Sequence, residues 1–126
     1  MPEFSLAAGV TRRVLIVEDD DDSRELLIEL IALLGHTAVG FSNARDALRA
    51  AKQAPPDVVL IDLGLPDASG CDIARSLRST AGAKMRLVAV TGYSDSVTRK
   101  LAAEAGFDEF VVKPFASDKL AALLDS

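Results

Sequence analysis

Acidic side chains gather where two apolar runs end, and their type indicates chemistry on phosphorus supported by a cation. Five consecutive acids, Glu18 to Asp22, directly follow the apolar run 14–17, and Asp62 directly follows the run 58–61. Carboxylates crowded at a dry site repel one another, and an all-oxygen site suits Mg²⁺ or Mn²⁺. A carboxylate supported by such a cation is a competent nucleophile toward phosphorus and gives an acyl phosphate. Asp62 is therefore the expected nucleophile.

Three further groups would complete such a site. Thr91 follows the run 86–90, and its hydroxyl can donate to a phosphoryl oxygen. Lys113 follows the run 110–112 and would supply a second positive charge beside the cation. The backbone carbonyl of Gly64 offers a third protein ligand to the metal. Alone, Thr91 is a packing residue and Lys113 a solvated amine; their joint placement after apolar runs is what indicates function.

Short apolar runs alternate with segments of helical spacing along the chain. The runs predict strands at 14–17, 37–41, 58–61, 86–90 and 110–112. Between them, helices are expected to end at Gly35 and Gly106. The fourth helix is expected to turn Val97, Leu101 and Ala105 toward the core.

The alternation itself predicts the fold class. Five repeats of strand then helix imply an α/β protein with a parallel sheet covered on both faces. Right-handed crossovers make it a doubly wound sandwich. Ligands of such sheets bind outside the carboxyl ends of the strands. Glu18, Asp19, Asp62, Thr91 and Lys113 should therefore converge on one rim.

The acids also have a structural interpretation. Asp19 to Asp22 could cap the first helix and complement its dipole. One carboxylate suffices for a cap, and Asp21, Asp22 or Ser23 is expected to take that role. Glu18 and Asp19 lie before the helix and stay available for a cation.

Bulk properties exclude several classes of protein. The 126 residues fit one domain, assigned to 12–126, with 1–11 set aside as an N-terminal extension or cloning scar. No apolar run is long enough for a membrane span. The net charge of −5 gives nucleic-acid binding no electrostatic support. The single cysteine, Cys71, permits no internal disulfide and suits a cytoplasmic location.

Four motifs in order resemble the response-regulator receiver domains of two-component signal transduction, of the chemotaxis-regulator type. They are Val14-Leu15-Ile16-Val17-Glu18-Asp19-Asp20, Val58-Val59-Leu60-Ile61-Asp62-Leu63-Gly64-Leu65-Pro66 with Gly70, Val88-Ala89-Val90-Thr91-Gly92, and Ala105-Gly106-Phe107-Asp108 leading to Val112-Lys113-Pro114-Phe115. The resemblance runs from about Arg12 to Leu124. It implies a flavodoxin-like sheet of order 2-1-3-4-5 with five helices.

The resemblance also implies a function for the rim. Asp62 would carry an aspartyl phosphate received from a histidine kinase or a histidine phosphotransfer protein. Asp19, Asp62 and the Gly64 carbonyl would bind the metal, with Glu18 acting through metal-bound water. Thr91 and Lys113 would contact the phosphoryl group. Such a domain catalyses only its own phosphorylation and dephosphorylation, and its Lys113–Pro114 bond is often cis.

A switch is implied as well. Phosphorylation would draw Thr91 toward Asp62, and Phe110 would fill the vacated space. The face of the fourth helix, fifth strand and last helix would change shape, and a homodimer through this face is left open. Many receivers carry tyrosine at the switch position, so Phe110 keeps the packing role and lacks a hydroxyl for a partner; it could also be plain core.

Two other classes compete with this interpretation. A phosphatase of the haloacid dehalogenase type also uses an aspartyl nucleophile, but it needs an Asp-x-Asp pair, and residue 64 is glycine. A degenerate receiver would serve only as a protein-interaction module, although every position of the expected site is filled here.

Overall fold

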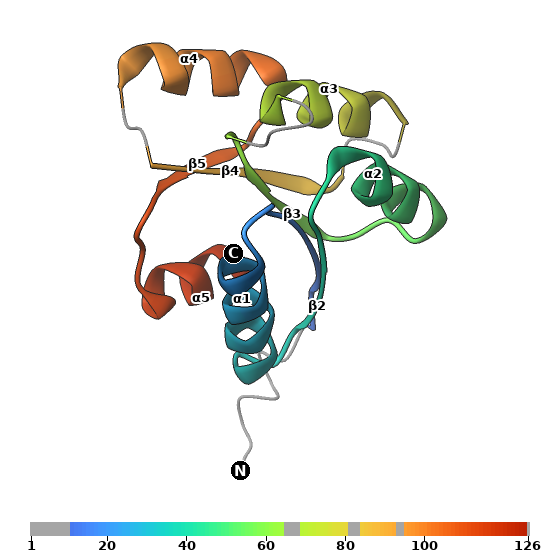
Figure 1. Cartoon of the computed structure of the whole chain (residues 1–126), viewed down its shortest axis with the longest axis vertical. Helices are drawn as coiled ribbons and strands as arrows, with labels where there is room; N and C mark the ends of the chain where they lie inside the picture. Colours follow the sequence, from blue (N-terminus) through green and yellow to red (C-terminus); the bar gives the residue numbers. More distant parts are fainter. Residues whose placement is uncertain (1–10, 65–68, 81–83, 93–94, 126) are drawn as a thin grey trace.

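The computed structural model describes residues 11–64, 69–80, 84–92 and 95–125. Strands and helices alternate along them (Figure 1). In chain order they are β1 (Arg13–Val17), α1 (Asp21–Leu33), β2 (Thr37–Phe41), α2 (Ala44–Gln53), β3 (Val58–Asp62), α3 (Gly70–Thr80), β4 (Arg86–Thr91), α4 (Ser96–Ala105), β5 (Glu109–Val112) and α5 (Ser117–Asp125). Each predicted strand agrees with the observed one to within one residue at either end. Pro66, part of one motif, lies outside the described residues.

The strands form one parallel sheet in the order β2-β1-β3-β4-β5, as predicted. Figure 1 shows α2, α3 and α4 on one face of the sheet and α1 and α5 on the other. Alternate residues of β1 enter different cores, because successive side chains of a strand point to opposite faces. Leu15 and Val17 pack under α2 and α3, whereas Val14 and Ile16 pack against α1 and α5.

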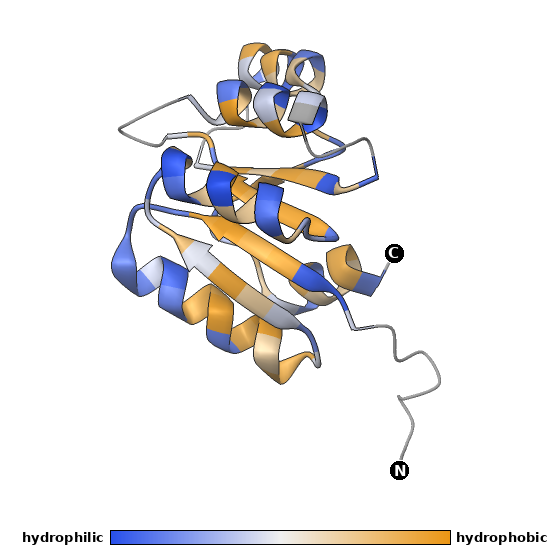
Figure 2. Cartoon of the chain, turned by 90° about the vertical axis from the view of Figure 1, so that its right-hand side faces the viewer, coloured by the Kyte–Doolittle hydropathy of each residue, from blue (hydrophilic) through white to orange (hydrophobic). Residues whose placement is uncertain are grey.

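The central strands are therefore apolar on both faces, which Figure 2 shows as orange strands running between the helices. None of the described helices is long and apolar enough to cross a bilayer.

Asp20 caps α1, so the expectation of Asp21, Asp22 or Ser23 was wrong. Asp20 has an extended backbone, and its Oδ2 accepts a hydrogen bond from the Ser23 amide at 2.8 Å. A cap must precede the first helical residue and reach the amide three residues on, and Asp21 is already helical. These hydrogen bonds from Ser23 lower the pKa of Asp20 because they stabilise the ionised carboxylate.

Residue types that favour helix ends are also found at the start of α2 and at the ends of α1 and α4. Asn43 caps α2 and accepts a hydrogen bond from the Asp46 amide at 2.9 Å. Gly35 and Gly106 lie at the ends of α1 and α4 with φ of 92° and 104°, a backbone conformation that glycine adopts without steric penalty.

The buried face of α4 agrees with the prediction at Ala105 but not at Val97 and Leu101. Val97 and Leu101 are 65% and 50% exposed, whereas Ala102 and Ala105 are buried. The helix packs on the sheet through small side chains, so the large apolar residues marked the wrong face.

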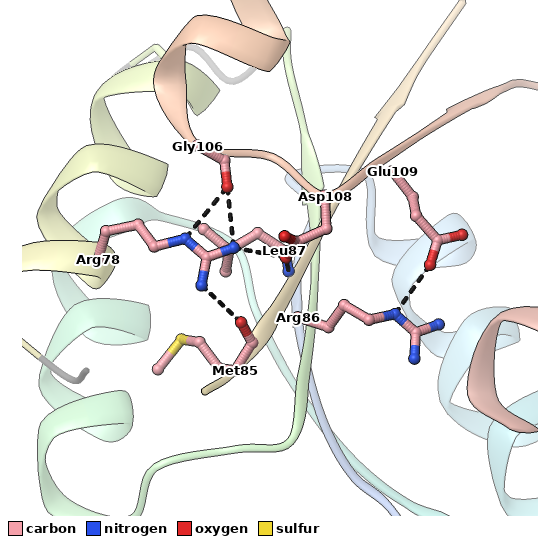
Figure 3. A network of polar contacts seen from close by, with 7 residues as sticks. All are labelled: Arg78, Met85, Arg86, Leu87, Gly106, Asp108 and Glu109. Atoms are coloured by element: carbon pink, nitrogen blue, oxygen red, sulfur yellow. Dashed lines mark hydrogen bonds and ion pairs between the residues drawn. The ribbon is translucent and has the colours of Figure 1, made fainter. Parts of the chain in front are cut away.

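Two arginines join elements at the end of the sheet opposite the strand carboxyl ends (Figure 3). Arg78 of α3 donates to the Met85 carbonyl at 2.7 Å and twice to the Gly106 carbonyl, at 3.1 and 2.9 Å. It also pairs with the carboxylate of Asp108. Arg86 of β4 pairs with Glu109 at 2.8 Å. The end of α3, the start of β4 and the turn between α4 and β5 are thereby held together.

We predict that Arg78→Met lowers the free energy of unfolding by about 2–4 kcal/mol, because it leaves partly buried carbonyls without their charged donor. Arg75→Met is the matched control, since Arg75 lies on the same helix and, among the described residues, makes only an exposed ion pair with Asp72. It should change stability by less than about 0.5 kcal/mol. Equal effects in urea denaturation would show that Arg78 does not hold these elements together.

Candidate functional site

Glu18 directly follows β1 and is buried, with 3% of its surface exposed. Its amide donates to the Phe41 carbonyl of β2 at 3.0 Å. Its side-chain Oε2 accepts from the Asp20 amide at 3.2 Å. The end of β1 thus places one carboxylate inside the rim.

Asp62 is the last residue of β3 and lies beside Glu18 at the same rim. Its side chain is 15% exposed, and Oδ1 accepts a hydrogen bond from the Gly64 amide at 2.9 Å. In the parallel register Asp62 is opposite Val90, one residue before Thr91. The pairing of β3 with β4 therefore places Asp62 at the carboxyl edge of the sheet, near Thr91.

Lys113 connects the two acids. Its Nζ lies 2.8 Å from Glu18 Oε1 and 3.3 Å from Asp62 Oδ2. Its amide donates to the Thr91 carbonyl at 2.7 Å, and the peptide bond to Pro114 is cis, as the resemblance implied. One ammonium group is thus shared by carboxylates from two strands.

The electrostatics of the three groups follow from this sharing. Burial raises the pKa of Glu18, and the nearby Asp62 adds to the rise, although the hydrogen bond from Lys113 opposes it. Burial by itself would lower the pKa of Lys113, but the hydrogen bond to Glu18 and the charges of both acids outweigh it, so the net pKa is raised. Lys113 therefore stays cationic at neutral pH.

Asp19 completes a group of carboxylates suited to a divalent cation. Glu18, Asp19 and Asp62 each offer an oxygen, and these atoms lie within 4.8 Å of one another. A cation with oxygen ligands at about 2.1 Å holds any two of them no more than about 4.2 Å apart. A small side-chain rotation or a bridging water closes the difference, so the donor set fits such an ion.

The expected switch residues lie on one face of the sheet. Phe110 is opposite Ala89 in the register, and Thr91 is two residues beyond Ala89 in the same strand. Thr91 and Phe110 therefore point to the face that α4 covers. Thr91 is buried and Phe110 half-buried. The metal-binding role of the Gly64 carbonyl stays a prediction.

Sequence reasoning missed two arginines near these groups. Arg24 donates through Nη1 to the Glu18 carbonyl at 2.9 Å. The guanidinium of Arg99 lies 4.6 Å from the centroid of the Phe110 ring, within the range of a cation–π contact. The one available signal was that Arg24 is the only Lys or Arg between Arg13 and Arg45.

The acids lie apart from a groove elsewhere in the described part of the chain. That groove runs between β2 and α2, and its lining includes Thr37, Val39 and Ala54 but no acidic residue.

The family model of the response regulator receiver domain matches residues 14–125. The transcriptional regulatory protein KdpE of Mycobacterium tuberculosis is 37% identical over 111 residues, which are 88% of this chain and 48% of that protein. The chain thus spans about half the length of this relative.

Solved structures of receiver domains have the same fold as this chain. A CheY-like receiver domain from Methylobacillus flagellatus is 34% identical with a TM-score of 0.80, covering 91% of this chain and 97% of that one. The receiver domain of a sensor histidine kinase from Pseudomonas aeruginosa has a TM-score of 0.83 at 24% identity, covering 91% and 95%. That neighbour holds a magnesium ion in its active-site cleft.

We predict a coupling energy of about 1–3 kcal/mol between Glu18 and Lys113 in a double-mutant cycle of Glu18→Gln and Lys113→Met, measured by urea denaturation without metal. The buried acid loses its compensating charge in Lys113→Met, whereas the double variant removes both charges. The exposed pair Asp72–Arg75 is the reference and should couple by about 0.3–0.5 kcal/mol. A coupling no larger than the reference would mean that Lys113 does not compensate Glu18.

Proposed function

Because this chain belongs to the response regulator receiver domain family of two-component signal transduction, we propose that Asp62 accepts a phosphoryl group from a histidine kinase or a histidine phosphotransfer protein. The observation that carries this proposal is that the Lys113 ammonium group is shared by the carboxylates of Glu18 and Asp62. Lys113 lies within 3.3 Å of both Glu18 and Asp62, so it is placed beside any group attached to Asp62. The chain is a phosphoacceptor signalling domain rather than an enzyme with an external product.

In the proposed step, one Asp62 oxygen attacks the phosphorus of the partner's phosphohistidine. The new O–P bond forms while the N–P bond breaks, and the departing imidazole takes up a proton. Lys113 would move from the Asp62 carboxylate to an oxygen of the phosphoryl group. Thr91, at the end of the neighbouring strand, would donate its hydroxyl to another of these oxygens.

We propose magnesium, or manganese in its place, as the cofactor. Asp19 and Asp62 would hold it with the Gly64 carbonyl, and Glu18 would act through a bound water. Such an ion neutralises charge on the transferring group when it is bound. Two observations support this: three carboxylates lie close together on the rim, and the structurally similar receiver domain from Pseudomonas aeruginosa holds a magnesium ion.

The output is proposed to pass through α4, β5 and α5. A phosphate can shift an equilibrium only by its different contacts in the two states, which here are those with Thr91 and Lys113. Thr91 and Phe110 share the α4 face of the sheet, so a displacement of one opens space for the other. The Arg99 guanidinium over the Phe110 ring links this residue to α4.

The proposal covers the receiver role alone. A relative such as MtrA of Mycolicibacterium smegmatis is described as a DNA-binding response regulator, and this chain spans 48% of it at 35% identity. The net charge of −5 gives this domain no electrostatic support for a DNA contact of its own.

Asp62→Asn should abolish uptake of phosphate from a small acyl-phosphate donor in the presence of Mg²⁺, because the amide is a poor nucleophile. Intact-mass measurement gives the fraction phosphorylated. Asp46→Asn, which changes an exposed acid on α2, should be phosphorylated like the wild type. Wild-type incorporation by the Asp62 variant would place the phosphate elsewhere.

Thr91→Ala should still be phosphorylated, while the change on α4 weakens, because the phosphoryl group loses a contact that differs between the two states. Amide chemical shifts of α4, with and without Mg²⁺ and a beryllofluoride mimic, measure that change. An unaltered response would remove Thr91 from the switch. A protein that binds no mimic at all would instead fit a degenerate interaction module.

A further inference from the structure

Arg24 is tied to the acidic rim by its position on α1. Its side chain is 17% exposed. Nη1 donates to the Glu18 main-chain carbonyl at 2.9 Å, and Nη2 pairs with Asp21 at 2.5 Å. One guanidinium therefore bonds the residue that follows β1 and the residue that begins α1.

Gly40 of β2 makes room for this side chain. A Cβ at Gly40 would lie 2.7 Å from Arg24 Cγ and 2.9 Å from Cδ, closer than real Cβ contacts. The Arg24 stem thus crosses the face of β2 at the one position of that strand without a side chain. The arrangement depends on two segments that are distant in the sequence.

The Glu18 carbonyl matters because it belongs to the peptide unit that leads into Asp19. The Glu18 amide is held by Phe41 of β2, and its carbonyl is held by Arg24. Asp19 itself is exposed, and in the part of the chain that the structure describes no hydrogen bond holds its carboxylate. The direction of the Asp19 side chain therefore depends on how its backbone is fixed.

We propose that Arg24, seated against Gly40, is a positioning residue for the cation site: it fixes the Glu18–Asp19 peptide so that Asp19 faces Asp62. This rests on the proposed function, in which Asp19 and Asp62 hold the metal. Groups that orient metal ligands without touching the ion commonly change metal affinity by about 10- to 100-fold when removed.

A purely electrostatic role for Arg24 gives the opposite sign. A cation near a cation site repels the ion, so its removal would tighten metal binding. Asp21 pairs with Arg24 and offsets much of its charge. The direction of the change in affinity therefore separates positioning from repulsion.

The test is the dissociation constant of Mg²⁺ alone, measured by isothermal titration calorimetry on the full chain. Arg24→Met should raise it by about tenfold, and Gly40→Ala should do the same because it displaces the Arg24 stem. Adding Gly40→Ala to Arg24→Met should change little more, since both act through one side chain. Arg75→Met removes an exposed ion pair of the same i,i+3 spacing and should leave the constant within about twofold.

A second readout needs no metal. Amide hydrogen exchange at Glu18 and Asp20, whose amides are hydrogen-bonded, should accelerate in Arg24→Met and Gly40→Ala and stay unchanged in Arg75→Met. If the wild type binds Mg²⁺ while Arg24→Met binds it equally well or more tightly, the positioning role is overturned and the proposed function stands. If the wild type does not bind Mg²⁺, the metal-dependent function fails, and Arg24 has no cation site to position.

Discussion

Repulsion between carboxylates is the constraint on which this rim depends. Glu18 and Asp62 belong to neighbouring strands, and one ammonium group, that of Lys113, lies within hydrogen-bonding distance of both. Burial raises the pKa of Glu18, so its ionised form is stabilised mainly by that lysine. Crowded negative charge of this kind favours a bound cation, because a cation offsets the repulsion between the carboxylates. The parallel sheet brings these charged groups together because β1, β3, β4 and β5 all end at the same edge.

The two ends of the sheet have different roles. At the edge opposite the acids, Arg78 and Arg86 bind carbonyl groups and carboxylates of neighbouring elements and hold α3, β4, β5 and α5 together. At the acidic edge, the carboxylates of Glu18, Asp19 and Asp62 instead form a group that could hold a metal ion. The C-terminal end of α4 is held by the Arg78 contact with Gly106, whereas Arg99 of the same helix touches Phe110. The two ends of α4 therefore contact different parts of the molecule, the arginine network at one end and a side chain of β5 at the other.

Much of this was predictable because it depends on local pattern. Runs such as 58–61 are too short for helices and apolar on both faces, so they had to be buried parallel strands, and Asp62 had to follow one of them. What failed depended on geometry that a linear pattern does not contain. The cap of α1 fell to Asp20 because the chain is still extended there. On α4 the small Ala102 is buried beside Ala105, whereas the larger Val97 and Leu101 are exposed. Arg24 was missed because it lies on α1, whereas Gly40, which makes room for it, lies on β2.

The account is tested most directly by finding where the phosphoryl group is attached. After reaction with a small acyl-phosphate donor and Mg²⁺, borohydride reduction converts an aspartyl phosphate to homoserine, which peptide mass spectrometry locates. We predict homoserine at position 62 alone, and none when Mg²⁺ is removed by a chelator. Homoserine at another aspartate, or a phosphate on a different residue type with position 62 unmodified, would contradict the account.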